Sequence, residues 1–326
     1  MKQKILITGG AGFIGSVRTA YLLYHGYEVV VVDDLSTGHS EAIDSRTSLI
    51  QSSILDKAVL VEALAGVNTV IHCAAKSLVE ESVSKPELYS QVNTEGTRVL
   101  LEAMSEAKVS NIIFSSTAAV YGDSKIQPIL ESGEINPVNP YGKSKIASER
   151  FISDSCSNGF AAITFRYFNV AGSYQSSSGQ LHVEDHKNET HLIPKIMKNY
   201  IKNKEKAQVE IYGDSWPTND GSCIRDYLHV TDLAAAHLLA LDALEVGKNQ
   251  VFNLGSGSGY SVFEVVNEIE KVVEDKLSKV MTPNRPGDPA VLLADIDKAR
   301  KELGWIPKAN LNQIISDSWQ GAKQLG

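Results

Sequence analysis

The sequence has no apolar run long enough to cross a membrane. Its longest runs fall well short of the roughly 20 apolar residues that a transmembrane helix needs. The amino terminus, MKQKILITGG, carries only the short apolar stretch 5–8, too short for the core of a signal peptide. We therefore expect neither a membrane partner nor a secretion signal.

Cysteine is scarce. The three cysteines, Cys73, Cys156 and Cys223, are far apart and form no CxxC pair. This usage is typical of a reducing cytoplasm and argues against a disulfide framework or a cysteine zinc site. The eight histidines form no HxH pair. We expect a cytoplasmic protein with no metal site.

Positive charge is in deficit, because 31 lysines and arginines face 39 acidic residues and the net charge is −8. This balance argues against nucleic acid or an anionic membrane as the main partner. The sequence shows no low-complexity tract and no internal repeat. Its 326 residues exceed one typical hydrophobic core, so we expect one large domain or two closely joined lobes.

The amino-terminal segment has the pattern of a dinucleotide-binding unit. In KILITGGAGFIGSVRTAYLLYHGYEVVVVDD, an apolar strand leads to a glycine turn, a helix and a β-branched strand that ends at Asp33. The turn fits Gly9, Gly12 and Gly15, and equally a pattern that starts at Gly10. Glycines there let the backbone approach a pyrophosphate at the positive end of the helix. This context predicts nucleotide binding.

Asp33 also indicates which cofactor binds. A carboxylate at the end of the second strand accepts hydrogen bonds from the adenosine ribose and repels a 2′-phosphate. The following residues, DLSTGH, include no arginine. The sequence therefore favours NAD over NADP.

Strand and helix signals continue to alternate along the chain. Apolar runs occur at 68–75, in VSNIIFSST and at 160–169, and a long amphipathic helix is predicted at 82–105. Near-continuous apolar strands alternating with helices predict an α/β fold with a doubly wound parallel sheet. Ligands of such folds bind at the carboxyl ends of the strands. The polar residues at those ends are Ser115, Ser116, Thr117 and Asn169.

The stretch NPYGKSKIASER places a phenol and an ammonium close together. Its proline and glycine indicate entry into a helix, and the following residues have a helical composition. Tyr141 and Lys145 then lie one turn apart on the same helix face. Taken alone, the pair is as compatible with a solvated helix surface as with chemistry.

Several motifs together resemble a known family. TGGAGFIGS, FSSTAAVYG, YGKSK and RYFNVAG are similar to those of the extended short-chain dehydrogenase/reductase superfamily. The later segments PTNDGSCIRDYLHVTDLA, FNLGSGSGYSV and RPGDPAVLLAD narrow the resemblance to the UDP-glucose 4-epimerase family, which interconverts UDP-galactose and UDP-glucose. The similarity runs from about residue 3 to about residue 320, and the ordered set of motifs is more specific than any one of them.

The resemblance implies that Thr117, Tyr141 and Lys145 are catalytic and that NAD transiently oxidises C4 of the sugar. A free phenol with a pKa near 10 is a poor base at neutral pH. An ammonium about 4 Å away lowers that pKa by roughly three units at an effective dielectric constant of 20, while burial opposes the effect. Thr117 can hydrogen-bond the reacting oxygen.

The resemblance also implies two sets of binding residues. NAD is expected to contact Gly9, Gly12, Phe13, Ile14, Gly15, Asp33, Asp34, Ser36, Thr37, Gly38, Ile54, Cys73, Ala74, Ala75, Ser77, Asn93, Tyr141, Lys145 and Phe168. The UDP-sugar is expected to contact Ser82, Thr117, Tyr141, Tyr167, Asn169, His191, Leu192, Tyr212, Arg225, Arg285, Asp288 and Leu292. The arginines suit bidentate phosphate contacts, with Asp288 at the ribose and Tyr212 on the uracil.

Several positions depart from the family pattern. Val17-Arg18 replaces a usual His-Thr pair on the first helix, where we expect packing rather than chemistry to change. Ser53 stands where an acid usually contacts the adenine. Leu292, aligned with a gate on sugar size, is intermediate in bulk and leaves acceptance of N-acetylhexosamines open.

Three alternative functions compete with this one. A nucleotide-sugar 4,6-dehydratase needs an acid pair directly after the threonine, and Ala118-Ala119 stand there instead. A UDP-pentose or UDP-N-acetylhexosamine 4-epimerase fits the same motifs. An NAD-sensing regulator without catalysis has little reason to keep Thr117, Tyr141 and Lys145 together.

The expected organisation has two parts. Residues 1–170 form the NAD-binding domain, completed by returning segments around 227–255, and residues 171–326 form the domain that binds the nucleotide sugar. The resemblance to the family also implies a homodimer through the helix at 82–105 and the YGKSK helix.

Overall fold

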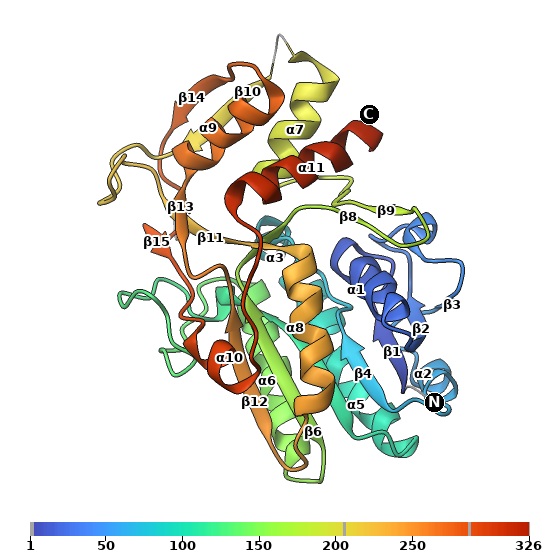
Figure 1. The fold of residues 1–326 in the computed structure, drawn as a ribbon. Coiled ribbons are helices and arrows are strands. Elements are labelled where there is room, and N and C mark those ends of the chain that lie inside the picture. Colours follow the sequence, from blue (N-terminus) through green and yellow to red (C-terminus); the bar gives the residue numbers. More distant parts are fainter. Residues whose placement is uncertain (1–2, 205–206, 286–287, 326) are drawn as a thin grey trace.

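A computed structural model describes residues 3–204, 207–285 and 288–325. A seven-stranded, all-parallel sheet forms the larger part of the molecule, with strand order β12-β6-β5-β4-β1-β2-β3 (Figure 1). Its strands are β1 (Lys4–Thr8), β2 (Glu28–Asp33), β3 (Ser48–Gln51), β4 (Thr69–His72), β5 (Asn111–Thr117), β6 (Ala161–Tyr167) and β12 (Asn249–Leu254). The predicted doubly wound parallel sheet is confirmed.

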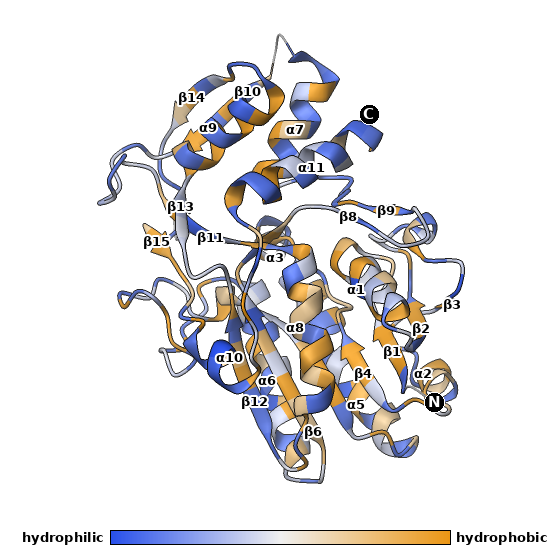
Figure 2. Cartoon of the chain, in the orientation of Figure 1, coloured by the Kyte–Doolittle hydropathy of each residue, from blue (hydrophilic) through white to orange (hydrophobic). Residues whose placement is uncertain are grey.

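Helices cover both faces of this sheet. The helices that pack on the main sheet include α1 (Phe13–Tyr24), α2 (Lys57–Ala63), α5 (Gly96–Glu106), α6 (Pro140–Cys156) and α8 (Val230–Ala243). Helices α1 and α8 pack together over one face, and α2, α5 and α6 pack in succession over the other. Strand β1 serves both cores, because Ile5 and Ile7 join the α8 side while Leu6 joins the α5 side. Figure 2 accordingly shows β1 and β2 as hydrophobic along their length.

The smaller part lies at the carboxyl end of the sheet strands (Figure 1). It contains β10 (Gln208–Tyr212) paired in parallel with β14 (Ser278–Thr282), and a hydrophobic core that includes Met197, Ile269 and Ile315. Its helices are α7 (Leu192–Lys202), α9 (Val262–Val273) and α11 (Leu311–Leu325).

Short elements connect the two parts. Strand β11 (Ile224–His229) pairs with β7 (Asn169–Ala171), β13 (Gly259–Ser261) and β15 (Val291–Leu292). The remaining elements are β8 (Tyr174–Gln175), β9 (Leu181–His182), α10 (Asp297–Glu302) and the 3₁₀ turns Ser40–Ala42 and Ala118–Val120. The strand that follows β11 and α8 is β12, which returns to the main sheet beside β6. The predicted division into an NAD-binding domain and a substrate domain near residue 170 stays a prediction.

The segment predicted as one long helix at 82–105 is divided. It comprises α3 (Val79–Ser84), α4 (Pro86–Tyr89), a π-helical turn (Ser90–Glu95) and α5. The division has a local cause, because Pro86 has no amide hydrogen to continue α3 and instead occupies the first turn of α4.

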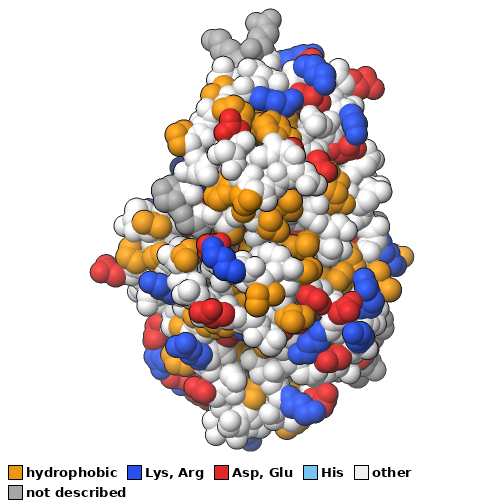
Figure 3. Space-filling view, turned by 90° about the vertical axis from the view of Figure 1, so that its left-hand side faces the viewer, with side chains coloured by type: hydrophobic (Ala, Val, Ile, Leu, Met, Phe, Trp, Pro, Cys, Tyr) orange, Lys and Arg blue, Asp and Glu red, His pale blue; other side chains and the backbone are white. Residues whose placement is uncertain are grey.

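Charges of both signs are interspersed on the face shown in Figure 3, and hydrophobic side chains gather across its middle. Within the described ranges, no helix is long and apolar enough to cross a membrane.

Candidate active site

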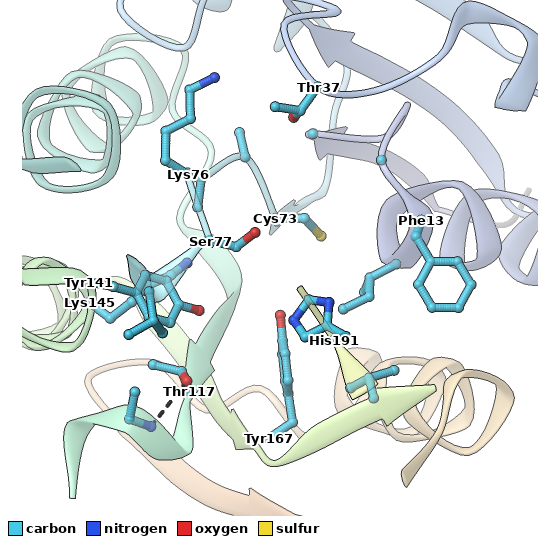
Figure 4. A pocket seen from close by; sticks show the side chains of 18 of the residues that line it. Phe13, Thr37, Cys73, Lys76, Ser77, Thr117, Tyr141, Lys145, Tyr167 and His191 are labelled. Carbon is cyan, nitrogen blue, oxygen red and sulfur yellow. Dashed lines mark hydrogen bonds between the residues drawn. The ribbon is translucent and has the colours of Figure 1, made fainter. Parts of the chain in front are cut away.

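A cavity of about 440 Å³ opens where the main sheet meets the smaller part. Residues from the carboxyl ends of β1, β2, β4, β5 and β6 line it, as a doubly wound sheet requires. Figure 4 shows Tyr141, Lys145, Thr117 and Tyr167 converging on this space, with Phe13 and Thr37 across from them. The glycine turn, the predicted catalytic residues and Arg225 thus share one cavity.

The glycine turn fits a bound pyrophosphate. A side chain at Gly15 would collide with the Gly9 carbonyl oxygen and the Gly10 backbone, and Gly9 has a left-handed φ of +73°. At Gly12, by contrast, a Cβ atom would meet only the Gly9 oxygen, at 3.6 Å. Gly12 caps α1 with no side-chain hydrogen bond to its first turn, so the first amide groups of α1 are left for an anion.

Asp33 lies where the adenosine ribose is expected. Its Oδ2 atom accepts from the Ala11 amide at 2.9 Å and its Oδ1 atom from the Leu35 amide at 2.8 Å. Burial raises the pKa of Asp33, although these amide bonds oppose the rise. The carboxylate lines the cavity and each of its oxygens keeps a further lone pair, so the site fits the ribose of NAD.

The catalytic candidates are placed by two elements, α6 and β5. Asn139 caps α6 by accepting from the Gly142 amide at 2.8 Å, and Pro140 occupies the first turn, which sets Tyr141 and Lys145 one turn apart. Thr117 ends β5, and its hydroxyl oxygen accepts from the Ala119 amide at 3.1 Å. In Figure 4 the Tyr141 hydroxyl points into the cavity.

Lys145 bonds to the backbone rather than to Tyr141. Its Nζ atom donates to the Ser115 carbonyl oxygen at 2.8 Å and lies 4.9 Å from the centre of the Phe114 ring. Burial lowers the pKa of Lys145 to about 8. Burial also raises the pKa of Tyr141, while a contact with Thr117 acts in the opposite direction. The expectation from sequence that Lys145 lowers the pKa of Tyr141 is therefore not met by the chain's own groups, because burial raises it.

Arg18 is a neighbour of the site that sequence reasoning assigned only to packing. It is 1% exposed, and its Nη1 atom donates to Cys73 Sγ at 2.6 Å and to Ser115 Oγ at 2.8 Å. Its Nε and Nη2 atoms have no hydrogen-bond partner in the part of the chain that the structure describes. The guanidinium lies 5.8 Å from the centre of the Tyr167 ring and opposes the rise in pKa that burial causes at Tyr167.

The cavity lining also includes candidate diphosphate contacts. Arg225 and Asp288 line it, 3.7 Å apart between Nη2 and Oδ2. Arg225 is fixed by bonds from Nη1 to the Ile224 and Pro289 carbonyl oxygens, both 2.9 Å. Arg285 lies 3.7 Å from the centre of the Tyr212 ring, so these two side chains form one stacked unit.

Most predicted site residues line the cavity, and six do not. Those outside the lining are Gly38, Ser82, Asn93, Leu192, Tyr212 and Arg285. Asn93 supports the wall instead, because its side chain bonds both backbone atoms of Lys76 and the Ser144 hydroxyl. Ser82 is fully buried and donates to the Val79 carbonyl oxygen at 2.6 Å.

Sequence reasoning missed other lining residues. Ser52 lines the cavity, whereas the neighbouring Ser53 accepts from the Leu55 amide at 3.2 Å. The further lining residues are Val32, Lys76, Val79, Val92, Ala118, Ala119, Gly122, Val138, Asn139, Val170, Glu184, His186 and Pro289. Lys76 and Ser52 carry no motif signal, because each is brought to the cavity by the loop after its strand. The roles assigned to the predicted site residues stay predictions.

The fold, the glycine turn and the paired tyrosine and lysine define a nucleotide-dependent enzyme of the doubly wound class. The model of the NAD dependent epimerase/dehydratase family matches residues 5–255. The chain therefore belongs to that family.

The chain is also similar to individual members of this family that are UDP-glucose 4-epimerases. A UDP-glucose 4-epimerase of Corynebacterium glutamicum is 43% identical over 99% of this chain and 97% of its own length. The structure of UDP-glucose 4-epimerase from Brucella ovis in complex with NAD superposes with a TM-score of 0.92, at 40% identity over 98% of each chain. The enzyme from Bifidobacterium longum, solved with NAD⁺ and UDP, gives 0.90 at 36% identity, covering 98% of this chain and 99% of that one. The resemblance predicted from the motifs is confirmed.

Proposed function

We propose that this protein interconverts UDP-galactose and UDP-glucose with bound NAD as its cofactor. The observation that carries the proposal is the shared cavity. The glycine turn, Asp33, the three catalytic candidates Thr117, Tyr141 and Lys145, and the pair Arg225 and Asp288 all line it. The similarity of the chain to UDP-glucose 4-epimerases supports the proposal.

The three catalytic candidates handle the proton. NAD, when bound, supplies the acceptor and later the donor of the sugar's C4 hydride and adds a positive ring to the site. Tyr141 accepts the proton of the 4-hydroxyl group and returns it at the end of the cycle. Lys145, charged below its pKa of about 8, favours the phenolate from one turn away. Thr117, whose side chain contacts Tyr141, steadies the reacting oxygen.

Epimerisation also requires the sugar to turn. After C4 is oxidised, the 4-keto sugar must present its opposite face before the hydride returns. Few contacts can therefore hold the sugar ring, and the nucleotide diphosphate must supply most of the binding energy. Arg225 suits this role because its guanidinium is fixed by two backbone carbonyls and retains donors for phosphate. We propose that the Tyr212–Arg285 stack binds the uracil end.

The cavity argues against dehydration. A 4,6-dehydratase needs a second acid–base pair after the threonine. Ala118 and Ala119 occupy those places and line the cavity, and neither can donate a proton. The family comprises both epimerases and dehydratases. The two alanines therefore favour epimerisation over dehydration for this chain.

The test is incubation of the purified protein with UDP-galactose and no added nicotinamide cofactor. Because NAD is proposed to bind tightly and to be regenerated in each cycle, UDP-glucose should accumulate until the two sugars reach equilibrium. A 6-deoxy-4-keto product would instead indicate dehydration. No product from folded, NAD-bound protein would contradict the proposal.

We also propose a homodimer and a cytoplasmic location. Val79 and Val83 on α3 are 43% and 66% exposed, and α3 packs against α6, which supports a partner surface there. The three cysteines are free, in keeping with a reducing compartment. Light scattering coupled to gel filtration, which reports the mass in solution, tests the dimer.

A further inference from the structure

Four metal-ligating side chains converge in the loop between β9 and α7. Glu184, His186, Glu189 and His191 form two ExH pairs in the sequence VEDHKNETH. One ligand atom of each lies within 4.8 Å of the others. The absence of an HxH pair gives no hint of this group, because its two histidines are five residues apart.

The contacts within the group close a ring. His191 Nδ1 lies 2.6 Å from Glu184 Oε1 and 3.3 Å from Glu189 Oε1. His186 Nδ1 lies 3.0 Å from Glu189 Oε2 and 3.5 Å from Glu184 Oε1. Each imidazole thus turns the same nitrogen toward both carboxylates. Four atoms placed about 2.0–2.1 Å from one tetrahedral ion are about 3.3–3.4 Å apart. For a set of four atoms that takes Oε2 from Glu189, two of the contacts, 3.0 and 3.5 Å, are close to that spacing and the third, 2.6 Å, is shorter.

Burial and charge also suit a cation. The Glu184 and Glu189 side chains are only 8% and 5% exposed. Two carboxylates with neutral imidazoles carry a charge of −2, which a divalent ion neutralises. The His186 and His191 side chains, 24% and 50% exposed, leave a route from solvent.

We propose that Glu184, His186, Glu189 and His191 form a zinc-binding site. Two nitrogen and two carboxylate donors, all within 4.8 Å of one another, suit zinc better than calcium or magnesium, which prefer six or more oxygen ligands. All four positions are filled by the protein, so the ion is structural rather than catalytic. Glu184, His186 and His191 line the cavity, and the ion would fix this wall and the start of α7.

Protonation of the two histidines is the alternative to metal binding in this group. Burial lowers the pKa of His191, but Glu184 and Glu189 outweigh it and raise the value to about 10. Protonated histidines beside the two carboxylates would make a closed set of ion pairs with no metal. Zinc must displace those protons, so the experiment has to separate the two occupants directly.

The experiment measures zinc uptake by the tag-free, NAD-bound protein. After equilibrium dialysis against zinc chloride and then metal-free buffer, elemental analysis should find about one zinc per chain. Glu189→Gln and His186→Gln should weaken binding by more than the roughly 10–100-fold that loss of an outer-shell partner costs. Glu245→Gln removes an exposed, ion-paired glutamate and should leave binding unchanged.

Cobalt(II) provides a readout that does not depend on whether the variants fold. Bound to the unaltered protein, it should show the intense visible absorption of four-coordinate cobalt, and zinc should abolish it. No retained metal, equal retention by Glu189→Gln and the unaltered protein, or only the weak absorption of six-coordinate cobalt would overturn the proposal. None of these outcomes bears on whether UDP-galactose is epimerised.

Discussion

Arg18 and Lys145 bond to the same residue at the end of β5. Arg18 Nη1 donates to the Ser115 hydroxyl, and Lys145 Nζ donates to the Ser115 carbonyl oxygen. Both distances are 2.8 Å. Two buried cations therefore meet at one strand end beside the candidate active site. Arg18 also contributes to lowering the pKa of Lys145, after burial. The surroundings of Ser115 therefore carry two positive charges before any ligand binds.

Replacing Arg18 with methionine should stabilise the protein. The change removes a buried guanidinium whose two bonded side chains, Cys73 and Ser115, are not carboxylates, while keeping most of the side-chain volume. We expect the free energy of unfolding to rise by about 1–3 kcal/mol. Urea unfolding of the NAD-bound protein measures this, with Arg150→Met, an exposed position on α6, as the control. A fall in stability for Arg18→Met alone would contradict the view that its charge is poorly compensated.

Tyr141→Phe should separate binding from chemistry. Removing the phenol oxygen should lower kcat by about 10²–10⁴-fold, the usual contribution of a general base. The dissociation constant for UDP should stay within about threefold, because the phenol is not proposed to hold the nucleotide. Steady-state kinetics and calorimetry measure the two quantities. Tyr24→Phe, at a 64% exposed tyrosine, is the matched control, and near-normal turnover by Tyr141→Phe would show that another group is the base.

Turnover should fall at alkaline pH. Burial holds the pKa of Lys145 at about 8, below that of a free lysine. The ammonium is therefore present below pH 8 and is lost as the pH rises through that value, and with it the stabilisation of the Tyr141 phenolate. A profile of kcat against pH should decline above about 8. A constant kcat up to pH 10 would show that the charge of Lys145 is not required.

Glu270 should link stability to acidic pH. Burial would raise its pKa, but bonds from Lys276 and Lys279, at 2.8 and 2.6 Å, and from the Leu277 amide outweigh it and lower the value to about 2. A carboxyl group whose pKa is lower in the folded than in the unfolded protein stabilises the fold at pH values above its unfolded pKa, here near 4.5. This stabilisation is lost as the pH falls toward 2.

Glu270→Gln should therefore reduce the free energy of unfolding at pH 7 by about 2 kcal/mol. Chemical denaturation at several pH values measures the difference, which should shrink below pH 4. The control is Glu302→Gln, at an exposed position near the end of α10. A difference that does not depend on pH would assign the effect of Glu270 to packing.

Local signals in the sequence predict the central part of the site. The glycines of the first turn carry a steric requirement, because Gly15 has no room for a Cβ atom. Tyr141 and Lys145 are joined by one helical turn, and Thr117 ends a recognisable apolar strand. Each of these features depends on neighbours in sequence. The parallel sheet then brings its strand ends to one edge, which is why local signals place them in one cavity.

Features that depend on distant contacts are not visible in the sequence. Arg18 lies among ordinary helix residues, and only the tertiary structure places its side chain beside Cys73 and Ser115. The partner of Lys145 is a backbone oxygen, which no residue type signals. Glu184 and His186 reach the cavity from a loop in the smaller part. Their positions follow from tertiary structure rather than from periodicity.

The central claim is that one carbon of the sugar is oxidised and then reduced by the same hydride. UDP-galactose deuterated at C4, incubated with the protein in ordinary water, tests it most directly. NMR or mass analysis of the UDP-glucose formed should find the deuterium retained at C4, because the hydride does not exchange with solvent while Tyr141 moves only the hydroxyl proton. Loss of deuterium to water, or its appearance at another carbon, would contradict the account.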